Sequence, residues 1–428
     1  MRTAAHPALG YCPPLATRRN SRSGWSGSSR RIALADAAIA CRGALRSAVG
    51  GRSVVAIFVF SRLAIWTVAV YTLLASEPSP RRGRGLALLT EVWSRWDSGW
   101  FLTIARHGYH GSAQSSAFYP LYPALVGLLG RLLIGHYVIA GILISLIACA
   151  AAFRLLYDLT EPRFGAETAR RAVLYLAVAP MSLFLQAVYS ESLYLLLALG
   201  VFVLAERGRY STAGMVAGRA LLTRPSGVVL FPVLAVLVWS STRSLRRVAW
   251  ATSGSLLFLV YPLVLWSQTG HAWRFLSVEK DWQRTALSPL GPLKGLWKGT
   301  VAAWNGVRQL AGQVPHPALA TDPTRIATLN LEYFAFLLVF IALAFLSWRR
   351  LGAAYGLFAA LSLSAPLSAP GIYYPLLSLP RFGLVIFPFY VVLAQLGERR
   401  SVDRWIVATS ALLLGAMTVQ WALGQWVS

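Results

Sequence analysis

The chain has 428 residues, of which 56% are apolar and only 13% are charged, and its mean hydropathy is +0.56. A soluble chain carries about a quarter of charged residues, so the composition excludes a soluble globular protein as well as a chain that is disordered throughout. The 16 Trp and 17 Tyr residues fit a polytopic membrane protein, because hydrocarbon accepts so much apolar surface. The three cysteines are scattered and show neither metal nor redox spacing.

The formal net charge of +25 comes almost entirely from arginine, since the chain has only three lysines, Lys280, Lys294 and Lys298. Nucleic-acid binders gather such charge on one soluble face. Here the arginines fall in short runs between apolar segments, which is the pattern of the positive-inside rule. We therefore expect no nucleic-acid partner, and a lipid bilayer as the surroundings of the chain.

Two regions are predicted: a disordered, basic cytoplasmic tail over residues 1–50, rich in Arg, Ser and Gly, and a multi-span membrane domain over residues 51–428. The first apolar stretch is too long for the core of a signal peptide. The predicted fold is all-α, with eleven transmembrane helices at about 54–75, 136–157, 172–190, 191–205, 211–223, 226–240, 248–267, 327–347, 351–367, 382–396 and 405–424.

The segment 118–135 is apolar but contains Pro120, Pro123 and Arg131. If it does not cross the membrane, all of the Arg-rich loops fall on the cytoplasmic side, namely 154–171, 206–209, 243–247, 349–350 and 399–404. We therefore interpret it as a re-entrant or outer-half helix. This topology puts two long loops, 77–118 and 268–326, on the extracytoplasmic side, and loops of that length are usually functional or disordered.

The acidic residues are few enough to consider singly, because the chain has only 15. No Asp-x-Asp motif occurs, and Glu279-Lys280-Asp281 is the nearest to a carboxylate pair. This pair is either a metal site or a solvated turn. We expect no metal and no cofactor.

Asp97 stands in a tryptophan-rich segment in which helical spacing would place Trp93, Trp96, Trp100 and Ile104 on one face. Such a helix would lie flat on the bilayer, anchored by its tryptophans. Asp97 would either cap this helix or, partly shielded from water, act as a general base.

Four further charged residues lie where predicted outer loops meet spans or inside an outer loop. Glu191 begins a span, where an acid complements the helix dipole. Arg224 and Arg381 lie at outer span ends, and Arg284 lies in an outer loop. These arginines either extend toward the headgroups from the bilayer or bind a phosphate, which a guanidinium holds bidentately. An embedded acid opposite outward-facing arginines would suit a lipid-phosphate substrate.

Five motifs, in order from about residue 55 to 396, resemble the PIG-V family of mannosyltransferases. They are Arg95-Trp-Asp-Ser-Gly-Trp-Phe-Leu followed by Phe118-Tyr-Pro-Leu-Tyr-Pro, Tyr189-Ser-Glu-Ser-Leu-Tyr, Leu222-Thr-Arg-Pro-Ser-Gly-Val, Trp282-Gln-Arg and Pro380-Arg-Phe. The family is similar in plan to the GT-C glycosyltransferases, multi-span enzymes that take sugar from a polyprenyl-phosphate donor on the outer leaflet.

The resemblance implies an inverting mannosyltransferase with Asp97 as the base and with Arg95, Trp96, Tyr119, Glu191, Arg224, Arg284 and Arg381 around the substrates. The donor would be a polyprenyl-phosphate sugar and the acceptor a glycolipid or glycan. The arginine bias is typical of a bacterial member, which would act at the extracytoplasmic face of the plasma membrane. The alternatives are a lipid or glycan transporter (a flippase), which favours polar mid-span residues and internal repeats, and a non-catalytic scaffold of the cell envelope.

Overall fold

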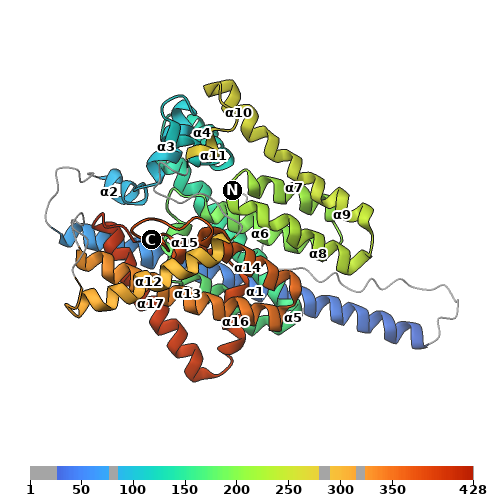
Figure 1. Cartoon of the computed structure of the whole chain (residues 1–428). Coiled ribbons are helices and arrows are strands. Elements are labelled where there is room, and N and C mark those ends of the chain that lie inside the picture. Colours follow the sequence, from blue (N-terminus) through green and yellow to red (C-terminus); the bar gives the residue numbers. More distant parts are fainter. Residues whose placement is uncertain (1–26, 77–84, 279–289, 315–322, 428) are drawn as a thin grey trace, which may run out of the picture. The chain divides into compact units, whose positions relative to one another are not determined.

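The computed structural model describes residues 27–76, 85–278, 290–314 and 323–427, and every regular element in these ranges is a helix (Figure 1). The described residues divide into two compact units, one that ends at Ser53 and one that begins at Val54. The α-helices are α1 (Gly27–Ala75), α2 (Leu86–Thr90), α3 (Ser98–His107), α4 (Leu121–Leu132), α5 (Tyr137–Ala177), α6 (Glu191–Glu206), α7 (Tyr210–Leu221), α8 (Leu230–Thr242), α9 (Leu245–Thr252), α10 (Val260–Thr269), α11 (Arg274–Ser277), α12 (Gly291–Leu310), α13 (Pro323–Leu351), α14 (Ala353–Leu367), α15 (Leu379–Leu384), α16 (Pro388–Leu396) and α17 (Arg400–Ala422). The 3-10 turns are η1 (Glu91–Trp93), η2 (Ala113–Ala117), η3 (Ser182–Leu185), η4 (Pro225–Val229) and η5 (Ser253–Leu259).

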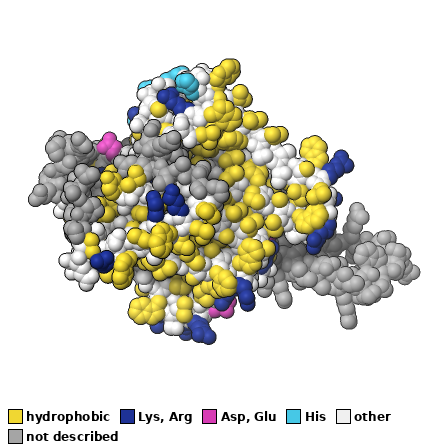
Figure 2. Space-filling model, viewed as in Figure 1, with side chains coloured by type: hydrophobic (Ala, Val, Ile, Leu, Met, Phe, Trp, Pro, Cys, Tyr) yellow, Lys and Arg dark blue, Asp and Glu magenta, His cyan; other side chains and the backbone are white. Residues whose placement is uncertain are grey.

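The predicted all-α membrane fold is confirmed, but the number of eleven crossings is not. Six helical segments within the described residues are long and apolar enough to cross a membrane: Gly50–Ala75, Tyr137–Ala177, Pro225–Thr242, Leu245–Thr269, Thr324–Leu351 and Arg400–Ala422. The helices α6, α14 and α16 have 16, 15 and 9 residues, fewer than the ~20 that an upright span needs. Apolar side chains spread over much of the face shown in Figure 2.

Helix α1 begins at Gly27, so residues 27–50 are helical where the sequence predicted a disordered tail. This segment contains many alanines and arginines, both strong helix formers, which explains the helix. Residues 1–26 of the predicted tail lie outside the described residues.

The predicted span 172–190 is wrong beyond Ala177, and the loop expected over 154–171 is only a sharp break. The element α5 consists of two helical stretches that meet at Gly165, whose φ of 83° suits a residue without Cβ. From Val178 to Ser190 the chain has no α-helix, only turns and the 3-10 turn η3, and most of these residues are buried. The guanidinium of Arg62 in α1 donates to the carbonyls of Ala177 and Ser182 at 2.9 and 2.8 Å. Irregular backbone at such a place is tolerated because protein groups satisfy it.

The predicted span 248–267 falls within the helical segment Leu245–Thr269, whose middle part, η5, is a 3-10 helix. The predicted span 382–396 is interrupted: it is divided between α15 and α16, and Pro388 starts the second helix. The segment 118–135 forms the short helix α4 of 12 residues, a length that fits the predicted half-span. Helices α6, α7 and α8 lie together, as do α12, α13 and α14 (Figure 1).

Candidate active site

Four charged residues that lie far apart in the sequence form a continuous row of ion pairs. Nη1 of Arg381 donates to Oδ2 of Asp97 at 2.7 Å, and Nε of Arg381 lies 3.4 Å from Oε1 of Glu191. The same Oε1 lies 2.7 Å from Nη1 of Arg224. The structure therefore brings together four of the predicted site residues, in the order Asp97, Arg381, Glu191, Arg224. We call these four residues the charge cluster.

Each member of the charge cluster stands at or near the start of a helical element. Asp97 directly precedes α3, and its side chain makes no capping bond there, so it is not simply a helix cap. Glu191 is the first residue of α6, where an acid complements the helix dipole. Arg224 precedes Pro225 in extended backbone, the conformation that a following proline favours. Arg381 lies in the short helix α15.

The charge cluster is buried but its hydrogen-bonding capacity is not fully used. The side chains of Glu191, Arg381 and Arg224 are 2%, 9% and 10% exposed, and that of Asp97 is 18% exposed. Oε2 of Glu191, Nη1 of Arg224 and Nε of Arg381 are buried and have no hydrogen bond to any residue that the structure describes, although both nitrogens face Oε1 of Glu191 as ion pairs. Buried polar atoms are normally hydrogen-bonded, so these donors are suited to a polar ligand.

The guanidinium of Arg381 contacts two carboxylates and lies over two aromatic rings. Burial lowers the pKa of its guanidinium, but the carboxylates of Asp97 and Glu191 outweigh this effect, so that its pKa is raised and it stays charged. The guanidinium carbon lies 5.6 Å from the ring centre of Phe184 and 5.4 Å from that of Tyr189. Aromatic faces favour a cation at such distances.

Tyr189, which stands in one of the motifs but is not among the predicted site residues, holds the backbone around Asp97. Its hydroxyl accepts from the Asp97 N–H at 3.2 Å and donates to the Arg95 carbonyl at 3.1 Å. Burial, and then the negative charge of Asp97, raises the pKa of Tyr189 well above its ordinary value, so the hydroxyl keeps the proton that it donates. Its position two residues before Glu191 in the same motif is the signal that could have selected it.

Replacing Tyr189 by Phe keeps the ring beneath Arg381 and removes both hydroxyl contacts. If Asp97 takes part in a reaction, we expect the turnover number to fall by about tenfold, because one or two net hydrogen bonds of ~0.5–1.5 kcal/mol each would be lost. The KM for a donor should change less than twofold. Tyr261→Phe is the control, since Tyr261 is equally buried and its hydroxyl donates to the distant Ser116 carbonyl. Equal effects of the two variants would leave Tyr189 with a packing role only.

Three other predicted site residues, Arg95, Tyr119 and Arg284, are not members of the charge cluster. Arg95 is half-buried, donates to the Ala422 carbonyl at 2.9 Å, and has a pKa lowered by burial. Tyr119 is buried beside Tyr261 and Phe275 in a group of aromatic rings. Arg284 lies outside the described residues.

The predicted single tryptophan face is wrong. Trp93 is fully buried at the end of η1, whereas Trp96 is 44% exposed and packs on Trp426. The chain breaks between them: Trp96 has a φ of 58°, and α3 begins only at Ser98. Helical spacing therefore does not extend from Trp93 to Trp100.

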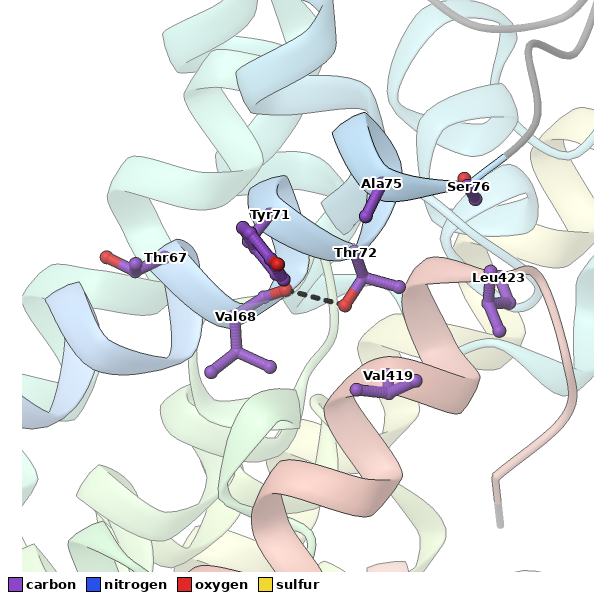
Figure 3. Close-up of a pocket in the computed structure, with 8 residues that line it drawn as sticks. All are labelled: Thr67, Val68, Tyr71, Thr72, Ala75, Ser76, Val419 and Leu423. Atoms are coloured by element: carbon purple, nitrogen blue, oxygen red, sulfur yellow. Dashed lines mark hydrogen bonds between the residues drawn. The ribbon is translucent and has the colours of Figure 1, made fainter.

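A surface groove of about 540 Å³ lies between α1 and α17, lined by Thr67, Val68, Tyr71, Thr72, Ala75, Ser76, Val419 and Leu423 (Figure 3). No member of the charge cluster lines it, so it is not the candidate site. Among the described residues no group of three or more His, Cys, Asp or Glu side chains could hold a metal ion. Glu279 and Asp281, the predicted metal site or solvated turn, lie outside those residues.

The fold and the charge cluster define a multi-pass helical membrane protein with a buried, charged site. Residues 85–252, which include Asp97, Glu191 and Arg224, match the family described as Mannosyltransferase (PIG-V). The match confirms the PIG-V resemblance over residues 85–252, which contain the motifs that begin at Arg95, Tyr189 and Leu222.

Two curated relatives are similar over the same part of the chain. GPI mannosyltransferase 2 of Yarrowia lipolytica is 33% identical over 136 residues, or 31% of this chain and 37% of that protein. GPI alpha-1,6-mannosyltransferase 2 of Mus musculus is 33% identical over 150 residues, or 32% of this chain and 29% of that protein. The chain thus matches about a third of the length of these relatives.

Two solved structures resemble the chain over most of its length. One is the oligosaccharyltransferase of Archaeoglobus fulgidus in its apo form, with a TM-score of 0.42 and 13% sequence identity. The superposition covers 83% of this chain and 56% of the oligosaccharyltransferase chain. The other is ArnT from Cupriavidus metallidurans bound to undecaprenyl phosphate, with a TM-score of 0.37 and 17% sequence identity. That superposition covers 86% of this chain and 77% of the ArnT chain.

Proposed function

We propose that this protein is an integral membrane mannosyltransferase. It moves a mannosyl residue from a polyprenyl-phosphate donor to a hydroxyl of a glycolipid or glycan at the extracytoplasmic face of the plasma membrane. The observation that carries the proposal is the position of Arg381 between Asp97 and Glu191. It places the proposed base, the Asp97 carboxylate, directly beside a guanidinium that could bind the donor phosphate. The family match over residues 85–252 supports mannose as the sugar.

The arginines of the charge cluster fit a lipid phosphate. A guanidinium presents several donors in a planar fork that matches phosphate oxygens. Nε of Arg381 and Nη1 of Arg224 both lie close to Oε1 of Glu191 without hydrogen-bond geometry. In our proposal these arginines stabilise the departing phosphate, and Glu191 holds the two guanidinium groups side by side.

The reaction is a single displacement at the anomeric carbon. The acceptor oxygen forms a bond to that carbon as the bond to the phosphate oxygen breaks, and Asp97 takes the proton of the acceptor hydroxyl. The polyprenyl phosphate leaves with the electron pair of the broken bond. Attack opposite to the leaving group inverts the configuration. Stabilising the charge that develops on the phosphate is the kind of contribution that usually dominates.

The ion pair between Arg381 and Asp97 makes the order of binding matter. While Nη1 of Arg381 holds Oδ2 of Asp97 at 2.7 Å, that oxygen is engaged. A donor phosphate competes with the carboxylate for the same guanidinium. Its arrival therefore frees Oδ2 to accept the acceptor's proton, and we expect the donor to bind before the acceptor reacts.

The function is tested by incubating purified protein in liposomes with radiolabelled polyprenyl-phosphomannose and a lipid extract. We expect label to move into a second lipid or glycan fraction, and no label to move from GDP-mannose. Transport of the labelled donor across the bilayer without transfer would favour the flippase instead. Asp97, Glu191 and Arg224 adjoin the starts of helical elements rather than mid-span positions, which does not favour a transporter.

The extracytoplasmic position of the site predicts opposite labelling of two exposed positions. Gln114 lies with Asp97 in the predicted outer loop 77–118, and Ser241 lies near the Arg-rich segment 243–247. Single cysteines at these positions, in a chain without Cys12, Cys41 and Cys149, should react with an impermeant maleimide from opposite sides. We expect the cysteine replacing Gln114 to react in intact cells. Reaction of both from the same side would contradict the topology.

A further inference from the structure

Helix α12 is fixed on the rest of the molecule by a face of small residues. Gly291, Gly295, Gly299 and Gly306 are buried, as is Ala303. A Cβ at Gly291 would lie 2.7 Å from the carbonyl oxygen of Ser368, and one at Gly306 would lie 2.9 Å from that of Ala327. Contacts this close leave no room for a side chain. The small-residue face therefore sets which side of α12 is turned away from the protein.

The outward face of α12 is apolar and rich in tryptophan. Leu293, Trp297 and Trp304 are 64%, 70% and 63% exposed, and they follow the i, i+4, i+11 spacing of one helical face. Val301, Val307 and Leu310 are exposed as well. Yet α12 is not one of the six segments in the described part of the chain that are long and apolar enough to span a membrane. Exposed Trp on such a helix is typical of the bilayer interface.

The charge of α12 is one-sided. The helix contains Lys294, Lys298 and Arg308 and no acid. The whole chain has only three lysines against 37 arginines, so two of the three fall in this one helix. Lys294 and Lys298 are four residues apart and thus share a side of the helix, next to Trp297. Such an edge is complementary to negatively charged headgroups, toward which each basic residue contributes attraction.

The position of α12 links it to the candidate site. It packs on α13 and α14 (Figure 1). A Cβ at Gly299 would lie 2.8 Å from Cδ1 of Leu376, which is five residues before Arg381. The buried face of α12 therefore packs against the segment that leads into α15.

We propose that α12 lies in the bilayer interface with Trp297 and Trp304 at the headgroup level, and that Lys294 and Lys298 bind the headgroups of anionic phospholipids. The occupant of this surface is the membrane itself rather than a protein partner. The proposal does not depend on the mannosyltransferase activity.

The test uses the full chain in vesicles of phosphatidylcholine with 30 mol% phosphatidylglycerol. A cysteine at Thr300, on the exposed face, carries a fluorophore, and Cys12, Cys41 and Cys149 are replaced. Quenching is compared between 5-doxyl phosphatidylglycerol and 5-doxyl phosphatidylcholine at equal mole fraction. We expect the anionic quencher to be two- to fivefold more effective. The variant Lys294→Gln/Lys298→Gln should bring this ratio to about one.

The control is Arg246→Gln/Arg247→Gln, which removes the same charge from an exposed pair on α9 and should leave the ratio unchanged. If neither doxyl lipid quenches the fluorophore, the proposed interfacial position of α12 is wrong. Equal quenching by both lipids in the unmodified helix would overturn headgroup binding. An equal loss of preference in the control would show that the net charge of the protein, not α12, attracts the anionic lipid.

Discussion

The variant Asp97→Asn should transfer mannose about 10²- to 10⁴-fold more slowly than the unaltered protein, the range that general-base help typically contributes. An amide is nearly isosteric with the carboxylate but cannot take the proton of the acceptor hydroxyl. The loss should appear in the turnover number, since the carboxylate acts on the acceptor. The measurement is initial-rate transfer from polyprenyl-phosphomannose in liposomes, at several donor concentrations.

Asp158→Asn is the matched control for this loss. Asp158 also pairs with an arginine, Arg154, at 2.9 Å, but in α5 and away from the charge cluster. Its variant should keep nearly full transfer. Near-normal transfer by Asp97→Asn would mean that another acid is the base, and Glu91 and Glu279 would be the next to test.

Glu191→Gln should destabilise the protein by about 3–5 kcal/mol, the cost of removing one partner from a buried ion pair. Two arginines depend on this carboxylate, since both Arg224 and Arg381 face its Oε1. If Glu191 served only to complement the dipole of α6, the cost would be about 1 kcal/mol or less. Unfolding by SDS titration from mild detergent measures the difference.

Glu206→Gln at the other end of α6 is the control for position in the same helix. Glu206 pairs with Arg163 at 2.8 Å, but both side chains are partly exposed, and such pairs contribute only about 0–1 kcal/mol. Adding Arg224→Gln to Glu191→Gln should restore part of the lost stability, because it removes the uncompensated charge. Equal destabilisation by Glu191→Gln and Glu206→Gln would contradict the ion-pair account.

The sequence predicted helix positions well where apolar segments are uninterrupted. The spans expected at 191–205, 327–347 and 351–367 match helices with nearby ends, and the span expected at 54–75 ends with α1 at Ala75. Composition could not show that the apolar segment after Ala177 is irregular. That irregular backbone depends on Arg62, more than a hundred residues earlier, which donates to its carbonyls. Hydropathy measures apolar content and contains no information about such long-range hydrogen bonds.

The site was predicted as single residues and not as an arrangement. Asp97, Glu191, Arg224 and Arg381 each stood out because a charge is unusual beside apolar segments. Their pairing joins residues up to 284 positions apart, which one sequence cannot reveal. The arginines were expected either to extend toward the headgroups or to bind phosphate. The structure shows Arg224 and Arg381 buried against carboxylates, which does not favour the first of these alternatives. The tryptophan face failed because periodicity assumed one helix across the break at Trp96.

The central claim is that Arg381 exchanges Asp97 for the phosphate of a lipid-linked donor. It is tested most directly by the affinity of a short polyprenyl phosphate, without sugar, for the unaltered protein, Arg381→Lys and Asp97→Asn. Lysine keeps the charge but loses the planar fork, so Arg381→Lys should bind about tenfold more weakly or worse, as expected when a charged hydrogen bond is lost. Asp97→Asn should bind at least as tightly as the unaltered protein, because the competing carboxylate is gone. Equal affinity of all three proteins, or weaker binding by Asp97→Asn, would contradict the account.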